Sequence, residues 1–189
     1  MSPILIAGPA VEPVALAEAK AFLRADGDAE DALVASLLAA AGEALELATR
    51  RLFIAQTWRL HLDRWPEGRA VRLPLAPVLS VVAVRVRPAS GPAAVLEAGL
   101  YRLEVAADPP RLLVDPAAPE PGLAASGIEI DARYGYGVAA GDVPAPIRLA
   151  IQRLAAFWFE HRGDESGAAR GLPGDVQPLV APFIRARLA

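Results

Sequence analysis

The sequence lacks cysteine altogether and has only two histidines among its 189 residues. Without cysteine there can be no disulfide bond, thiolate nucleophile or thiolate metal ligand. The two histidines, His61 and His161, each lack a carboxylate or second histidine at a metal-binding interval such as His-x-x-x-His. We therefore predict that the chain has no metal site and no cofactor.

Long apolar runs are also missing. The apolar opening at residues 3–7 is too short for the core of a signal peptide and has no basic residues before it. No run approaches the ~20 apolar residues of a membrane span. These two absences predict a soluble protein that makes no contact with a membrane.

A surplus of basic residues is absent as well. The 19 basic and 22 acidic residues give a net charge of −3, whereas a protein that grips nucleic acid over its whole surface carries an excess of Lys and Arg. Divided at residues 53 and 143, the chain has 4 basic and 8 acidic residues, then 9 and 10, then 6 and 4. The net charges are therefore −4, −1 and +2, and only the carboxyl end is basic.

What the sequence does have is apolar content, at 54% of residues, and helical periodicity near its amino end. The spacing predicts a short helix over residues 16–24 and a longer one after Asp28, which we expect to cap it with Asp31 three residues on. The apolar series of the longer helix is Leu33, Leu37, Leu38, Ala41, Leu45, Ala48 and Leu52. Its alanines, Ala40 and Ala44 among them, make it slim enough to approach another helix closely, within the subunit or across a subunit boundary.

After residue 53 the period changes from helical to alternating, which is typical of strands with one buried face. Four clear runs and two weaker ones predict a small antiparallel sheet or sandwich. The clear runs centre on Leu60, Val84, Leu103 and Ile130, and the weaker ones cover residues 70–73 and 111–114. Prolines fall between the runs, where a missing backbone donor does least damage.

Helical periodicity returns at Pro146, and Ile147, Ile151, Leu154, Ala155 and Trp158 trace one apolar stripe. Phe157 and Phe159 flank this stripe, so that little of the helix is polar near its end, and we expect its contacts to be extensive or shared with a neighbouring subunit. The predicted class is α+β, with a β-rich insertion at residues 54–143 between helical parts at 1–53 and 144–189.

The sequence offers no convincing catalytic constellation. Glu129 and Asp131 could in principle serve as the acid and base of a glycoside hydrolase. They alternate with apolar residues on a predicted strand and share a face with Arg133, which favours a solvated surface. His161, near the predicted end of a helix, suits a capping role better than proton transfer. We predict that the protein is not an enzyme.

The order of landmarks along nearly the whole chain resembles the head-tail connector, or adaptor, proteins of long-tailed bacteriophages, in the branch shared with prophages and gene transfer agents. Each landmark is weakly specific, and their common order is the stronger signal. The segments are 14–20 (VALAEAK), 57–66 (TWRLHLDRWP), Leu73-Pro74, 134–137 (YGYG) followed by 143–147 (VPAPI), 158–162 (WFEHR) and Leu172-Pro173. The sequence departs from the pattern at Ala15, where relatives carry Ser or Thr before the first helix.

The resemblance implies a helical connector core with the β-sheet inserted between its helices. It further implies a structural protein at the neck of a phage or gene transfer agent particle, assembled in the bacterial cytoplasm. About twelve copies form a ring below the portal, DNA passes through without sequence-specific binding, and a stopper or tail-terminator protein attaches beyond. The expected portal contact is the carboxyl tail, and deletion of residues 176–189 should abolish it. Its residues are Leu179, Val180, Phe183, Ile184, Arg185 and Arg187, and the helix packing between subunits is assigned to Ala40, Ala44, Phe157 and Phe159.

Two other interpretations stay open at this point. A tail-completion or stopper protein would occupy the same neck. A β module that binds a carbohydrate or peptide could use the sheet's aromatic residues, which are Trp58, Trp65, Tyr101, Tyr134 and Tyr136.

Overall fold

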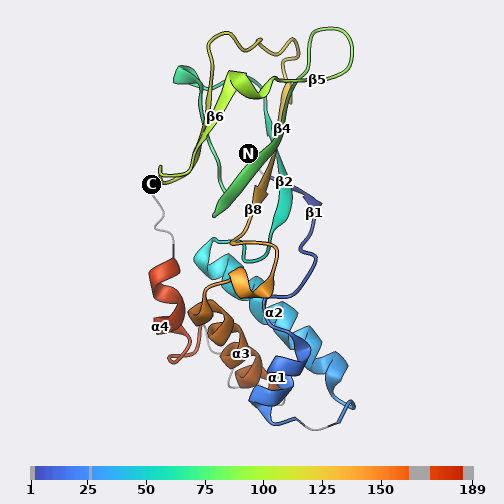
Figure 1. Cartoon of the computed structure of the whole chain (residues 1–189), viewed down its shortest axis with the longest axis vertical. Helices are drawn as coiled ribbons and strands as arrows, with labels where there is room; N and C mark the ends of the chain where they lie inside the picture. The colour runs from blue at the N-terminus through green and yellow to red at the C-terminus, as the bar shows by residue number, and fades with distance from the viewer. Residues whose placement is uncertain (1–2, 26, 162–170, 185–189) are drawn as a thin grey trace. The chain divides into compact units, whose positions relative to one another are not determined.

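The computed structural model describes residues 3–25, 27–161 and 171–184 and divides the chain into two compact units. One unit combines Met1–Pro9 with Ala55–Gly135 and holds the strands β1 to β8, and the other combines Ala10–Ile54 with Tyr136–Ala189 and holds the helices α1 to α4 (Figure 1). Helices and antiparallel sheets together confirm the α+β class.

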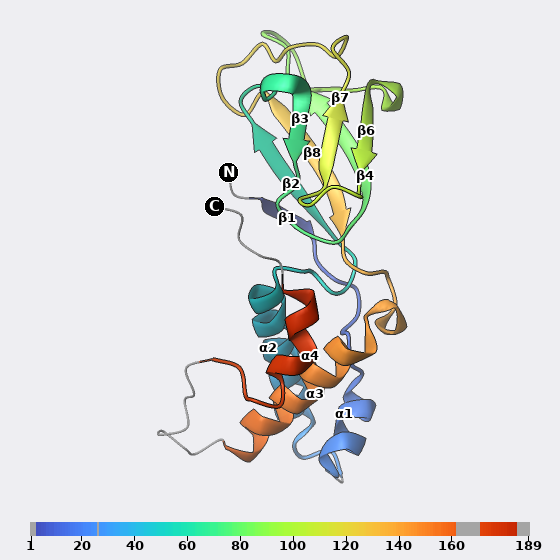
Figure 2. The same ribbon diagram turned by 90° about the vertical axis from the view of Figure 1, so that its left-hand side faces the viewer.

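The β unit has two antiparallel sheets that lie face to face (Figures 1 and 2). The larger has the order β1 (Ile4–Ala7), β2 (Gln56–Leu62), β8 (Ile128–Tyr134), β4 (Val78–Val86) and β5 (Ala94–Val95). The smaller has the order β3 (Ala70–Arg72), β7 (Arg111–Val114) and β6 (Tyr101–Glu104). The alternating runs predicted all of these strands except the short β1 and β5.

Alternation accounts for the core of this unit. Leu60, Ile130 and Val84 lie opposite one another on β2, β8 and β4, and all three are buried. Leu112 of β7 is buried as well. The pattern fails at Val82, which strict alternation places on the same buried face as Val84 but which is 56% exposed. The register of β4 against β8 shifts between Val81 and Ala83, and such a bulge reverses the alternation locally.

The helical unit contains α1 (Leu16–Leu23), α2 (Asp31–Thr49), α3 (Ala145–Glu160) and α4 (Gln177–Val180). Its core is formed mainly by apolar residues of α2 and α3, with contributions from the segments that flank them. The buried members include Val14, Val34, Leu38, Leu45, Phe53, Ile147, Ile151, Leu154, Val176 and Val180. The single-turn 3₁₀ helices η3 (Ala140–Asp142) and η4 (Ala181–Phe183) precede α3 and follow α4, and η1 (Glu67–Arg69) and η2 (Ala98–Leu100) belong to the β unit.

Two features of α2 differ from the sequence prediction. Glu30, not Asp28, occupies the N-cap position, and the Asp28 carboxylate accepts a hydrogen bond from the Lys20 ammonium group at 3.2 Å. The buried stripe is also displaced, since Val34 is buried while Leu33 faces outward.

Helix α2 also has the length and mean hydropathy (1.5) of a membrane span, although the core helices of soluble proteins can pass the same test.

The strand-to-helix connection depends on one glycine. A Cβ atom at Gly137 would come within 2.1 Å of the Asp142 carboxylate. That carboxylate accepts a hydrogen bond from the Ala139 amide at 2.9 Å and so holds the turn that leads into α3. The preceding strand, β8, ends at Tyr134, immediately before Gly135.

Candidate interaction surfaces

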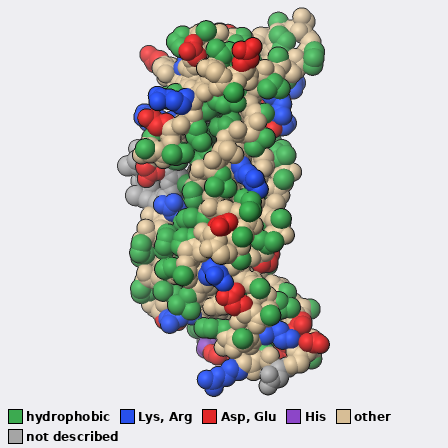
Figure 3. Space-filling model, viewed as in Figure 1, with side chains coloured by type: hydrophobic (Ala, Val, Ile, Leu, Met, Phe, Trp, Pro, Cys, Tyr) green, Lys and Arg blue, Asp and Glu red, His purple; other side chains and the backbone are tan. Residues whose placement is uncertain are grey.

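The carboxyl-terminal segment packs as part of the helical unit. Val176 and Val180 have no exposed surface, and Leu179 and Phe183 pack partly buried against the same core. The Arg51 Nε donates a hydrogen bond of 2.7 Å to the Phe183 carbonyl oxygen. Hydrophobic side chains gather over α3 and α4 on the face drawn in Figure 3.

This packing is inconsistent with the predicted portal contact of one residue, Val180. Val180 belongs to the chain's own core and offers no surface to a partner. Ile184 is half exposed and remains available, while Leu179 and Phe183 present only their outer edges. Arg185 and Arg187 lie outside the described residues.

The four residues predicted to pack between subunits divide into two sets. On α2, Ala40 is exposed, whereas Ala44 packs partly buried against the helical core. At the end of α3, Phe159 also packs against that core, and the Phe157 ring stacks on the His161 ring with 4.3 Å between centroids. Ala40 is therefore the most accessible of the four.

His161 has the capping role that the sequence favoured. It follows the last residue of α3, and its Nδ1 lies 2.7 Å from the Phe157 carbonyl oxygen. The same carbonyl already accepts a hydrogen bond of 3.1 Å from the His161 backbone amide, so an imidazole that donates there adds a second hydrogen bond at the end of the helix.

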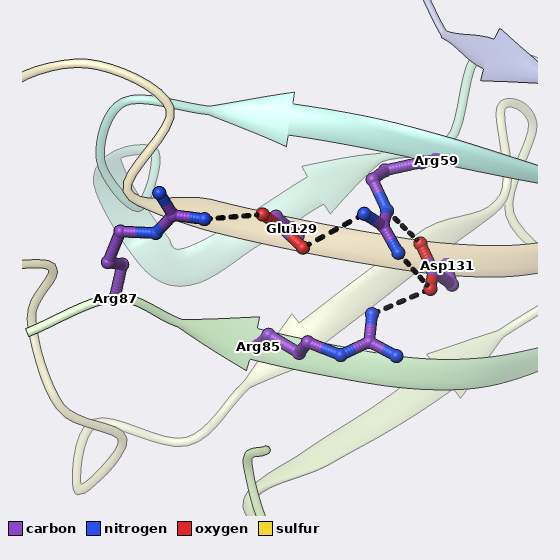
Figure 4. Close-up of polar contacts among 5 residues, drawn as sticks. All are labelled: Arg59, Arg85, Arg87, Glu129 and Asp131. Carbon is purple, nitrogen blue, oxygen red and sulfur yellow. Dashed lines mark hydrogen bonds and ion pairs between the residues drawn. The ribbon is translucent and has the colours of Figure 1, made fainter. Parts of the chain in front are cut away.

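A charged cluster on the outer face of the larger sheet was not foreseen (Figure 4). Two carboxylates of β8 are enclosed by arginines from β2 and from the β4 strand and its end. Asp131 accepts hydrogen bonds from Arg59 Nε at 2.6 Å, Arg59 Nη2 at 2.9 Å and Arg85 Nη1 at 2.6 Å. Glu129 is held by Arg59 at 3.2 Å and Arg87 at 3.1 Å.

The cluster overturns the expectation of a solvated acidic pair. Asp131 is 4% exposed and Glu129 9% exposed, because the guanidinium groups cover them. Cross-strand register could have revealed this, since Arg59 lies opposite Asp131 and Arg85 lies opposite Glu129. The sequence alone does not supply that register.

The geometry also argues against acid–base chemistry at these carboxylates. The Arg59 hydrogen bond, with help from Arg85, holds the pKa of Asp131 below its usual range, although burial opposes the shift. A carboxylate so stabilised in its charged form is a poor proton donor at neutral pH. All four carboxylate oxygens of the pair already face guanidinium nitrogens.

The pKa of one carboxyl group in the helical unit is shifted in the opposite direction. Burial raises the pKa of Glu46 to about 7, and the nearby charges of Glu43 and Glu12 add to this. The Phe53 amide donates a hydrogen bond of 2.6 Å to Glu46 and partly offsets the shift.

Within the described ranges, no group of three His, Asp or Glu side chains is placed to hold a metal ion.

Four of the five aromatic residues named for the carbohydrate interpretation do not share a binding face, while the fifth, Tyr101, is half-buried. Trp65 and Tyr134 are buried, and the Trp65 indole donates to the Pro119 carbonyl oxygen at 2.9 Å. The Trp58 indole donates to the Gln56 side chain at 3.0 Å, and Tyr136 belongs to the helical unit. These contacts use the aromatic rings and their polar groups for packing.

Comparison with known proteins gives matches among solved structures. The chain shares 30% identity and a TM-score of 0.80 with a chain in the neck of an empty GTA particle computed with C6 symmetry, covering 100% of this chain and 98% of the other. The same values hold for a chain in the virion of a native gene transfer agent (GTA) particle. The chain belongs to the family of gene transfer agent neck proteins.

A third match for this GTA neck protein is a chain in the neck of a native GTA particle computed with C12 symmetry. Identity is again 30%, the TM-score is 0.73, and the coverage is 98% of this chain and 97% of the other. No family model and no curated protein sequence matches the GTA neck protein. The similarity therefore supports membership of the family over nearly the full length of the chain.

Proposed function

We propose that this neck protein is the head-tail connector, or adaptor, of a tailed phage or gene transfer agent particle. About twelve copies form a ring below the portal, and the tail attaches on the far side. The observation that carries this proposal is the full-length similarity to chains of particle necks, at 30% identity and with matched necks computed in C6 and C12 symmetry. The role is structural and needs no catalytic group or cofactor.

The division of the chain supports a connector core with an insertion. The sequence predicts a core of residues 1–53 and 144–189 with residues 54–143 inserted into it. We infer the same arrangement with shifted bounds, since β1 pairs with β2 and residues 1–9 join the β unit, which leaves residues 10–54 and 136–189 for the core. In support, residues from both ends of the chain share one helical core, in which α2 and α3 supply most of the buried side chains. The β unit has a hydrophobic core of its own.

The charge of the chain suits a channel through which DNA passes without being held. A net charge of −3 provides little attraction for the phosphate backbone, and tight binding would oppose movement of the genome. We place the protein in the particle neck after assembly in the bacterial cytoplasm. Electron microscopy of intact particles that carry a tagged chain tests this location, and density for the tag away from the neck would contradict it.

We propose that the portal contacts the end of the carboxyl segment. Ile184 is its exposed apolar anchor, the edges of Leu179 and Phe183 extend the surface, and Arg185 and Arg187 pair with portal acids. Deletion of residues 176–189 is a poor test, because it removes Val176 and Val180 from the core. Deletion of residues 184–189 keeps both.

The shorter deletion should leave the melting temperature of the protein nearly unchanged and abolish its binding to purified portal. A matched control replaces Val105, which is exposed in the β unit, with Asp and should bind portal normally. Normal portal binding by the 184–189 deletion would refute the assignment of the contact.

A stopper or tail-completion protein of the same neck is the second candidate. One matched neck was computed with C6 symmetry, which a ring of six copies also satisfies. An adaptor should bind isolated portal directly and form a ring with the mass of about twelve copies. A stopper should bind only after an adaptor is in place.

A further inference from the structure

The helical unit has an apolar groove along one side of α2. Its volume is about 520 Å³. The walls come from residues 11–12, 14–16 and 138–140, and α2 contributes Ala35 and Leu38. Val11 and Val138 on the walls are 45% and 58% exposed, so the groove is open to a partner.

A second apolar surface, which we call the α2 stripe, lies on the other side of the same helix. Its residues follow one another at three- or four-residue steps. Leu33, Ala40 and Leu47 are exposed, and Leu37 and Ala44 between them present an edge while they pack partly buried against the helical core. Leu47 is 81% exposed, the highest value among the large apolar side chains of the described chain. At 3.6 residues per turn, the stripe lies roughly 170° around the helix from Ala35 and Leu38.

Rotational symmetry requires two such surfaces on each copy. In a ring of identical subunits every contact is head-to-tail, so a subunit meets its two neighbours through different and complementary faces. The matched necks were computed with C6 and C12 symmetry. A convex stripe and a concave groove on opposite sides of one helix have the placement that a ring contact needs.

Charge at the two surfaces is complementary as well. Arg50 follows Leu47 by three residues at the end of α2 and is exposed. Glu12 lines the groove and is also exposed. Neither residue forms an ion pair with another residue in the part of the chain that the structure describes.

We propose that the α2 stripe of one copy seats in the groove of the next copy, with Arg50 facing the neighbour's Glu12. Repetition of this contact closes the ring. The proposal rests on the proposed neck function and adds to it the pair of surfaces by which the copies recognise one another.

The absence of cysteine from the chain makes cross-linking a direct test. Two double variants place thiols at either end of the stripe and on the groove wall: Leu47→Cys with Val138→Cys, and Leu33→Cys with Val138→Cys. Assembled necks are treated with a short bis-maleimide and run on a denaturing gel. At least one double variant should give a ladder of oligomers extending to the full ring.

The control variants give the test its specificity. Each single cysteine variant should give no ladder, because a head-to-tail contact does not bring a residue against its own copy. Leu47→Cys with Val105→Cys should also give none, since Val105 is equally accessible but lies in the β unit. Dimers from Leu47→Cys alone would indicate a stripe-to-stripe contact and overturn the proposal.

The remaining outcomes separate this proposal from the function on which it rests. If the double variants are present in necks and neither cross-links, the stripe and groove do not meet, although the neck function stands. If the unsubstituted chain is absent from necks, the proposed function itself fails. As a second readout, Arg50→Glu should reduce incorporation into necks at least tenfold, and adding Glu12→Arg should restore it; failure of the restoration would contradict the charge pairing.

Discussion

Asp131 shows how a charged side chain can stabilise the sheet from its outer face. The carboxylate is almost completely covered, and three guanidinium nitrogens from Arg59 and Arg85 compensate for the loss of water. Removing one partner of such a cluster leaves buried charge uncompensated, which costs more than a surface ion pair contributes.

We predict that Asp131→Asn lowers the free energy of unfolding by about 2 kcal/mol at pH 7. Because the pKa of Asp131 is depressed in the folded protein, its stabilising contribution is present at neutral pH and is lost as the pH falls through that depressed value. The difference between variant and parent, measured by urea denaturation, should therefore shrink in acid. Glu104→Gln, which removes a more exposed ion pair with Arg111, should change stability by less than about 0.5 kcal/mol; an equal effect would contradict the role of burial.

Glu46 has the opposite pH dependence. Its pKa is raised from 4.5 to about 7 in the folded protein, so the folded state binds a proton that the unfolded chain has released. Stability from this group is complete below pH 4.5 and is lost as the pH rises through 7. Glu46→Gln keeps an oxygen for the Phe53 amide and removes the charge.

We predict that Glu46→Gln is more stable than the parent by about 2 kcal/mol at pH 8 and equal to it near pH 4. Chemical denaturation across this range measures the difference. The matched control is Glu97→Gln, which replaces an exposed acid in the β unit and should leave the stability difference from the parent the same at both pH values. A constant difference between Glu46→Gln and parent would show that the carboxylate is not desolvated.

At the scale of the element, α1 begins without a side-chain cap. Ala15 occupies the N-cap position with extended backbone angles of φ −71° and ψ 147°, and its side chain is exposed. The Glu18 carboxylate, three residues on, binds Arg148 at 2.6 Å. A hydroxyl at position 15 could accept a hydrogen bond from one of the free amides of the first turn.

We predict that Ala15→Ser raises the free energy of unfolding by about 0.5–1 kcal/mol. The gain should appear as a higher midpoint of urea denaturation with an unchanged slope. Ala17→Ser, at an exposed position inside the first turn, should bring no gain, because serine is a poorer helix former than alanine. Equal effects of the two substitutions would contradict a capping mechanism.

Elements whose residues follow a helical or alternating period could be predicted from the sequence, whereas side-chain burial that depends on strand pairing could not. The expected first helix, residues 16–24, matches Leu16–Leu23 closely, and the predicted strand at 111–114 matches β7. The exposure of Val82 and the burial of Asp131 depend on a bulge and on cross-strand register, which long-range contacts determine. The portal and subunit contacts assigned to residues such as Ile184 and Ala40 stay predictions. Val180 lies in the core and is therefore removed from the proposed portal contact.

At the scale of the whole molecule, the two units have separate cores. The β unit encloses residues such as Leu112 and Ile130, and the helical unit encloses Leu154 and Val180. Units with their own cores can open separately, and hydrogen exchange of backbone amides reports each opening.

We predict that a core substitution accelerates exchange only in its own unit. Val180→Ala removes two buried methyl groups at a cost of about 1–2 kcal/mol, so amides of α2 and α3 should exchange roughly five- to thirtyfold faster while those of β8 are unchanged. Leu112→Ala should accelerate the exchange of amides in β7 and β8 and leave the exchange rates of amides in α3 unchanged. Mass spectrometry of peptides from the exchanged protein measures both patterns. Acceleration in both units by either variant would mean that the chain unfolds as one cooperative body, and the helical unit and the β unit would then not be separable parts.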